Sequence, residues 1–273
     1  MRRRLTFGLY ALEAERKLGP TLDSFCDWLG ESLDAEVACD ETPDYETLAQ
    51  RVRNREIDVA WLPPIVLIRA GDGALPVASL RRGNRGGFET ALVVRADSEL
   101  RDLRDLRGKR AAWVDAWSAA GYVIPRLRLR LSGLDLSDLF AEEHFYGTHT
   151  SALRALLAGD ADVAGTYAHT DAEGNVVDGP WNDIEDADVR ILATFGEIPA
   201  DVFAVHPGIP ADLRAELLRV LIAAGNDAGV RALMKQIFGA TAFGPVDLQS
   251  YDGLRSTLSL ANRTDDWDDM SSA

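Results

Sequence analysis

The 273-residue sequence predicts an α/β protein with two lobes, each built on a mostly parallel sheet flanked by helices. The length exceeds one typical domain and falls short of two large ones. Short apolar runs alternate with amphipathic segments, which is the pattern of βαβ units. A glycine-rich basic turn at residues 81–87 interrupts this alternation. We expect the chain to cross into the second lobe there.

The first lobe begins with regularly alternating strand and helix signals. We expect strands over residues 5–10, 35–39, 58–62 and 75–80, and helices over residues 18–29, 45–54 and 65–70. Pro63 and Pro64 end the third strand and suit the first turn of a helix. In open α/β sheets, ligands bind at the carboxyl ends of strands. The end of the 58–62 strand is therefore expected to face a ligand.

The second lobe and the return of the chain follow the same logic. We expect strands over 88–95, 109–114, 143–146, 162–166 and 190–195, helices over 118–131, 151–157, 210–224 and 230–238, and a polar surface loop over 171–188. These elements predict a discontinuous first lobe, residues 1–87 and 190–263. Residues 88–189 would form the second lobe, and residues 264–273 an acidic tail, expected to be disordered.

Composition excludes several classes of partner. The formal net charge is −15, with 44 acidic and 29 basic residues, whereas nucleic-acid binding needs a basic face. No segment approaches the roughly 20 apolar residues that span a bilayer. We therefore expect neither a nucleic-acid partner nor a membrane span.

The two cysteines and the first residues bear on the cellular compartment. Cys26 and Cys39 are expected to be reduced core residues, although the sequence leaves a disulfide between them open. The apolar run after Arg4 is too short for the core of a signal peptide. The expectation is a cytoplasmic location, or a periplasmic one if a leader has been removed.

Three segments carry a resemblance to a known family. They read REIDVAWLPP (residues 55–64), DLRGKRAAWVDAWSAAGY (105–122) and FYGTHTSALRALLAGDADV (145–163). In order and spacing they resemble the phosphate, phosphite and phosphonate substrate-binding proteins of ABC transporters, which have the type II periplasmic-binding-protein fold. The resemblance implies a small anionic ligand in a cleft that closes by a hinge, a transporter or signalling partner, and no cofactor.

The second segment resembles the anion loop of that family. Where the family has Ser-Thr-Ser, this chain has Ser118, Ala119 and Ala120 before Gly121. Ser118 is a good helix N-cap, and backbone amides at a helix start favour an anion. Two hydroxyl donors are nevertheless lost, at about 1.5–3 kcal/mol each. A carboxylate therefore becomes an alternative to a phosphonate, and Ser118 could equally serve as a plain helix cap.

The remaining site residues come from the resemblance and from their positions. His149 matches the family's ligand-side histidine, before a helix opened by Thr150 or Ser151, and Asp201 could pair with a ligand ammonium. The other expectation for each is a structural residue or a solvated carboxylate. The full set of candidate ligand-binding residues is Tyr10, Trp61, Phe88, Thr90, Trp117, Ser118, Ala119, Ala120, His149, Tyr167 and Asp201. No catalytic or metal-ligating residue is proposed, since no histidine pair has metal-ligand spacing.

Two other functions stay open. The same fold occurs in cytoplasmic enzymes such as the chorismate dehydratase-like proteins, although the sequence has no nucleophile elbow, zinc motif, P-loop or dinucleotide-binding glycine motif. Ala119 and Ala120 also fit a degenerate cleft used for protein interaction. Binding of a small anion is the expected function.

Overall fold

The computed structural model describes residues 2–10, 19–81, 87–171, 173 and 175–261. The expected acidic tail at residues 264–273 and most of the glycine-rich turn lie outside this part of the chain. The chain divides into two compact units: unit 1 is Met1–Gly87 with Pro199–Gln249, and unit 2 is Phe88–Ile198 with Ser250–Ala273. Two of the boundaries differ from those expected. The chain returns to unit 1 at Pro199 rather than near residue 190, because β10 (Val189–Pro199) continues through that position.

The sheet of unit 1 has the strand order β12-β4-β11-β3-β1-β2. Its strands are β1 (Arg3–Tyr10), β2 (Ala35–Thr42), β3 (Val59–Leu62), β4 (Leu75–Arg81), β11 (Val202–Val205) and β12 (Ala242–Gly244). β1 is parallel to β2 and β3, whereas β11 is antiparallel to both β3 and β4. β11 and β12 were not among the strands expected from the sequence.

The described residues of unit 1 form five α-helices: α1 (Gly19–Ser32), α2 (Tyr45–Arg53), α3 (Pro64–Ala70), α6 (Ala211–Ala224) and α7 (Ala228–Phe238). α2 begins where expected because Asp44 caps it, accepting from Thr47 N at 2.6 Å. The core contains a cluster of rings in which Phe7 stacks on Phe203 at 5.1 Å and Phe25 meets Phe238 edge-on at 5.2 Å. Such pairs stabilise the packing beyond their buried area.

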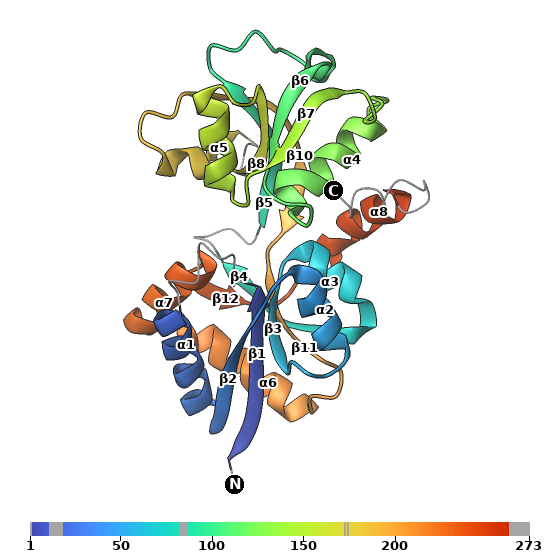
Figure 1. Ribbon diagram of the computed structural model, residues 1–273. Coiled ribbons are helices and arrows are strands. Elements are labelled where there is room, and N and C mark those ends of the chain that lie inside the picture. The colour runs from blue at the N-terminus through green and yellow to red at the C-terminus, as the bar shows by residue number, and fades with distance from the viewer. Residues whose placement is uncertain (1, 11–18, 82–86, 172, 174, 262–273) are drawn as a thin grey trace. The chain divides into compact units, whose positions relative to one another are not determined.

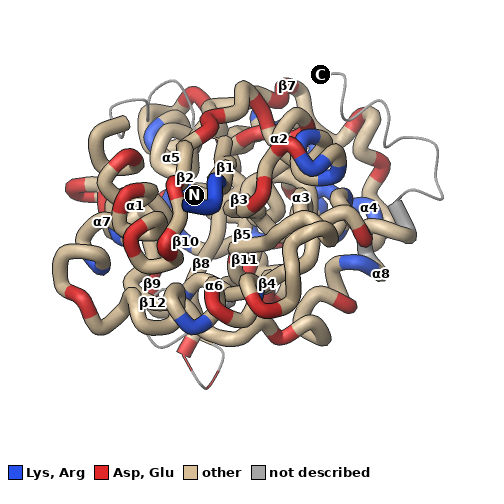
Figure 2. The backbone as a smooth tube through the Cα atoms, turned by 90° about the horizontal axis from the view of Figure 1, so that it is seen from below, with Lys and Arg blue, Asp and Glu red and all other residues tan. Residues whose placement is uncertain are grey.

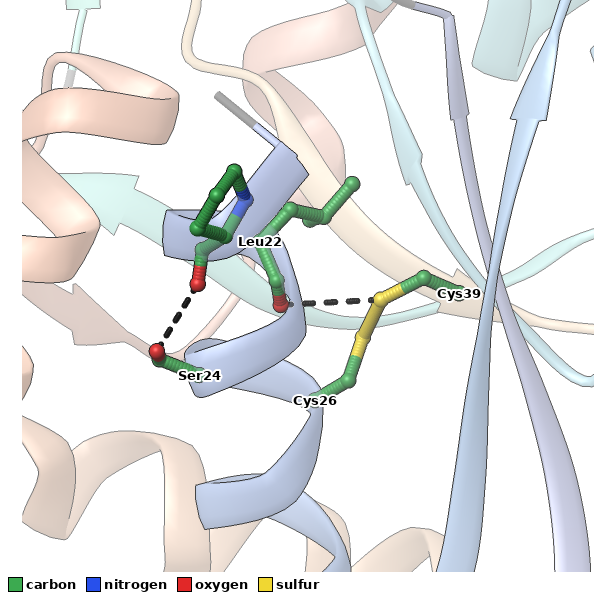
Figure 3. The surroundings of a disulfide bond; sticks show 5 residues. Leu22, Ser24, Cys26 and Cys39 are labelled. Carbon is green, nitrogen blue, oxygen red and sulfur yellow. Dashed lines mark hydrogen bonds between the residues drawn. A yellow bond between two sulfur atoms is a disulfide. The ribbon is translucent and has the colours of Figure 1, made fainter. Parts of the chain in front are cut away.

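A disulfide joins Cys26 in α1 to Cys39 in β2 (Figure 3), so the expectation of two reduced cysteines is wrong. The two Cα atoms lie 6.3 Å apart, a separation that permits the bond. Sequence alone could not show this, because the distance between the residues depends on how α1 packs on β2.

The sheet of unit 2 has the order β10-β5-β8-β6-β7, with β9 paired to β8. Besides β10, its strands are β5 (Gly87–Arg95), β6 (Lys109–Trp113), β7 (Phe140–Phe145), β8 (Val163–Thr170) and β9 (Val176–Asp178). β6 is parallel to β7 and β8, and β5 is antiparallel to β8. β9 and a short 3-10 turn, η5 (Pro180–Asp183), occupy the segment expected to be a plain loop.

Helices cover both faces of this second sheet. α5 (His149–Ala158) packs on the face that carries Ala91, Val93 and Ala164. A helix that begins as the π turn η4 (Ala119–Val123) and continues as α4 (Ile124–Leu131) lies on the opposite side (Figure 1). α8 (Asp252–Ala261) also belongs to unit 2 and contacts α4, whereas the sequence analysis placed this stretch in the first lobe.

Charge and hydropathy agree with the composition. Figure 2 shows acidic positions spread over the helices and loops of the chain, with fewer basic ones between them. Among the described residues, no helix combines the length and apolar character needed to cross a membrane.

Candidate functional site

Eight of the eleven candidate residues gather at one edge of the unit 2 sheet. Because β6, β7 and β8 are parallel, their carboxyl ends share this edge. The helix at residues 119–131 starts just after β6, and α5 starts just after β7. The antiparallel β5 begins at the same edge, which brings Phe88 and Thr90 beside the end of β8.

The turn after β6 is shaped by Ser118. Ser118 is the N-cap, and its Oγ accepts from Gly121 N at 3.0 Å. The amide of Gly121 therefore bonds within the protein and is not available to a ligand. The first backbone amides of a helix have no hydrogen-bond acceptor within that helix. The N–H groups of Ala119 and Ala120 are therefore the ones that would favour an anion. Both residues are buried, 8% and 3% exposed.

Two glycines set how closely this turn packs on β8. A Cβ at Gly121 would lie 2.3 Å from Val114 Cγ2, and one at Gly165 would lie 2.8 Å from the carbonyl oxygen of Gly121. The turn and the strand thus meet backbone to backbone. Gly165 was not among the candidates, and its only signal in the sequence is a glycine inside a strand.

Asp115 stabilises the same turn through two hydrogen bonds from backbone amides. Its Oδ1 accepts from Trp117 N at 2.7 Å, and its carbonyl accepts from Ser118 N at 3.2 Å. Burial raises the pKa of the Asp115 carboxyl, an effect that the hydrogen bonds from the Trp117 and Ser118 amides oppose. Asp115 was not among the candidates, although an aspartate three residues before a serine helix cap is a recognisable turn signal.

His149 is the first residue of α5. The N-cap is Thr148, whose Oγ1 accepts from Ser151 N at 3.1 Å, so the helix begins earlier than expected. The ring nitrogen Nδ1 lies 3.0 Å from Oγ1 of Thr166, which is fully buried in β8. This hydrogen bond fixes the orientation of the imidazole. Thr166 was not among the candidates, because nothing in its local sequence marks it as a partner of His149.

Aromatic rings line the same edge. The ring of Tyr167 lies 4.9 Å from His149, 5.3 Å from Phe88 and 5.5 Å from His169. Thr90 lies directly opposite Tyr167 in the strand pairing and is fully buried. Within the described part of the chain, the Thr90 hydroxyl has no hydrogen-bond partner.

The other three candidates lie at the carboxyl edge of the unit 1 sheet. Tyr10 ends β1 and meets the ring of Tyr45 at 4.5 Å, while Trp61 in β3 meets Phe238 at 5.2 Å. Side chains alternate along these paired strands, which places Tyr10 and Trp61 on opposite faces of the sheet. Asp201 is 7% exposed and precedes β11. Its expected pairing with a ligand ammonium stays a prediction.

The chemistry at the unit 2 edge is that of binding. Helix amides, hydroxyl groups and an imidazole are hydrogen-bond donors for an anion, and rings form apolar walls. No three His, Cys, Asp or Glu residues lie close enough to hold a metal ion, as far as the described residues show.

The fold defines the class of protein: two α/β units, formed by alternating parts of one chain, as in two-lobed solute-binding proteins. XAC2383 from Xanthomonas citri, solved bound to ATP, matches with a TM-score of 0.76 and 22% identity over 95% of this chain and 98% of that one. PhnD1 from Prochlorococcus marinus, solved in complex with methylphosphonate, matches with a TM-score of 0.75 and 16% identity, over 95% and 98%.

Sequence comparison identifies the family within this class. The family model described as "ABC transporter, phosphonate, periplasmic substrate-binding protein" matches residues 7–251, and the chain belongs to this family. It is similar to the "Phosphate-import protein PhnD" of Mycolicibacterium smegmatis, with 25% identity over 92% of this chain and 84% of the relative. The recognition made from three sequence segments is confirmed.

Proposed function

We propose that this protein is a receptor for a small oxyanion of the phosphonate class and binds it at the carboxyl edge of the unit 2 sheet. The observation that carries the proposal is the pair of helix starts at this edge. Ser118 caps the helix that follows β6, and Thr148 caps the helix that follows β7. Helix N-termini carry a partial positive charge and exposed amides, so an anion is stabilised beside them.

The relatives support a tetrahedral ligand. One is named for phosphate import, and one was solved with methylphosphonate. The alternative is a carboxylate, which the alanines at positions 119 and 120 favour because it needs fewer donors. Delivery to an ABC transporter follows from the family, and hinge closure between the units stays a prediction.

The disulfide favours a location outside the cytoplasm. Disulfides persist in oxidising compartments and are rare in the cytosol, where thiols are kept reduced. The Cys26–Cys39 bond and the periplasmic description of the family both favour this location over the cytoplasmic one that the sequence led us to expect.

Isothermal titration of the purified protein with methylphosphonate, inorganic phosphate, methanesulfonate and acetate tests the proposal. We expect saturable binding of methylphosphonate or phosphate, and His149→Ala should weaken it about 10- to 150-fold, since a hydrogen bond to a charged group contributes about 1.5–3 kcal/mol. His144→Ala is the matched control, because His144 is exposed on β7 beside Glu142.

Each other outcome has a distinct meaning. Binding of acetate alone would identify a carboxylate receptor. Chemical conversion of a probe would favour the enzyme alternative, and retention of none of the four would favour a degenerate site. An unchanged affinity in His149→Ala would place the ligand elsewhere.

A further inference from the structure

The hydroxyl of Thr90 is an unusual feature of unit 2. Thr90 lies within β5, is 0% exposed, and its Oγ1 has no hydrogen-bond partner among the described residues. Burying a hydroxyl without a partner costs about 1–3 kcal/mol. Valine has nearly the same shape and at least as high a preference for strands. An orphan hydroxyl at this position therefore calls for an explanation other than the fold.

The pairing of β5 with β8 shows which way Thr90 faces. Thr90 is opposite Tyr167 and Leu92 is opposite Gly165, so these four residues share one face of the sheet. Gly165 meets the backbone of Gly121 on that face. Thr90 thus lies on the face covered by the turn at residues 118–121, and its partner Tyr167 is two residues nearer the carboxyl end of β8 than Gly165.

Two half-buried rings flank Thr90. Phe88 precedes it by two residues on the same face, Tyr167 lies directly across, and these rings contact each other at 5.3 Å. Thr90 therefore has one aromatic side chain beside it on its own strand and another on the paired strand. Ring rotation is a small movement compared with any change of the strand.

The helix start supplies donors from one direction only. Amides at Ala119 and Ala120 can satisfy the two oxygens of a planar carboxylate, but the side chains at these positions carry no hydroxyl. Thr90 lies on a different element, β5, on the sheet face that the turn covers. A donor from this second direction suits the third oxygen of a tetrahedral group.

We propose that Thr90 is a specificity-determining residue, whose hydroxyl donates to a bound tetrahedral oxyanion once the Phe88 and Tyr167 rings turn aside. This inference rests on the proposed function. It assigns to β5 a donor that compensates for the hydroxyls absent at positions 119 and 120, and it makes the site prefer phosphonate or phosphate to a carboxylate.

Thr90→Val and Thr90→Ser test the proposal with methylphosphonate and acetate as calorimetric probes. We expect Thr90→Val to weaken methylphosphonate binding about tenfold or more, because it loses a hydrogen bond to a charged group, and to leave acetate affinity unchanged. Thr90→Ser keeps the hydroxyl and should retain most of the affinity for methylphosphonate.

Unfolding in urea gives an independent measurement on the ligand-free protein. Thr90→Val should be as stable as the wild type or more stable, since it removes an unpaired buried hydroxyl. Thr42→Val is the contrasting variant and should be less stable, because the Thr42 hydroxyl donates to Leu9 O at 3.2 Å or Asp44 O at 3.1 Å.

The outcomes separate this inference from the proposed function. Wild-type binding of methylphosphonate that Thr90→Val leaves unchanged would overturn the role of Thr90 alone. A loss in Thr90→Val that Thr90→Ser shares equally would assign the effect to strand packing and would overturn it too. Absence of binding to the wild type would overturn both.

Discussion

At the scale of single residues, Asp115 shows how one carboxyl shapes the turn that leads to the candidate site. Its Oδ1 accepts a hydrogen bond from Trp117 N, and the residue lies in the turn that leads to the Ser118 cap. Burial raises the pKa of the Asp115 carboxyl, so the folded protein binds the carboxyl proton more tightly than the unfolded chain does. The charged carboxylate therefore lowers stability once the pH rises through its folded pKa, and the penalty is absent below its unfolded pKa.

Asp115→Asn should remove this penalty while the amide oxygen still accepts from Trp117. We expect the variant to be more stable than the wild type at pH 7, with a difference that shrinks as the pH falls toward about 4. Urea unfolding across this pH range measures it. Asp135→Asn is the opposite case, because bonds from Ser137 lower the pKa of Asp135 and its stabilising effect disappears at low pH. A stability difference for Asp115→Asn that does not change with pH would contradict the assignment.

At the scale of elements, the disulfide ties α1 to β2 in unit 1. The two cysteines are 13 residues apart, and closing a loop of this length stabilises a fold by about 3 kcal/mol. Cys26→Ala with Cys39→Ala should lower the free energy of unfolding by about that amount, and reductant should bring the wild type close to the variant. Protein recovered from cells under thiol-trapping conditions should contain no alkylated cysteine. Full alkylation, or equal stability of variant and wild type, would argue against an oxidised protein in the cell.

At the scale of the whole molecule, the assignment of α8 to unit 2 predicts which elements lose stability when the packing of α8 is weakened. Leu254 and Leu258 are each 6% exposed, and α8 contacts α4. Leu254→Ala with Leu258→Ala should cost about 2–5 kcal/mol per residue. Hydrogen exchange should accelerate in α4 while β1 and β3 stay protected. The exposed Ser256→Ala is the control. Faster exchange in α6 and α7 instead would place α8 with unit 1.

The sequence by itself determined the family, the alternation of strands and helices, and the Ser118 cap at the candidate site, whereas α5 begins two residues before its expected start. These features depend only on residues that are close in sequence, so they can be recognised without a structure. They include helix caps, hydrophobic periods and the segments at 55–64, 105–122 and 145–163. Residues such as Ser118 and Trp117 could be named because they lie within these segments.

Only the tertiary structure decided which residues distant in sequence come together. The Cys26–Cys39 bond, the Thr166 partner of His149, the insertion of β11 between β3 and β4, and the placement of α8 with unit 2 each join residues distant along the chain. Such pairings depend on sheet order and helix packing rather than on local sequence. The buried, unpartnered hydroxyl of Thr90 belongs to the same group, because burial is a property of the whole fold.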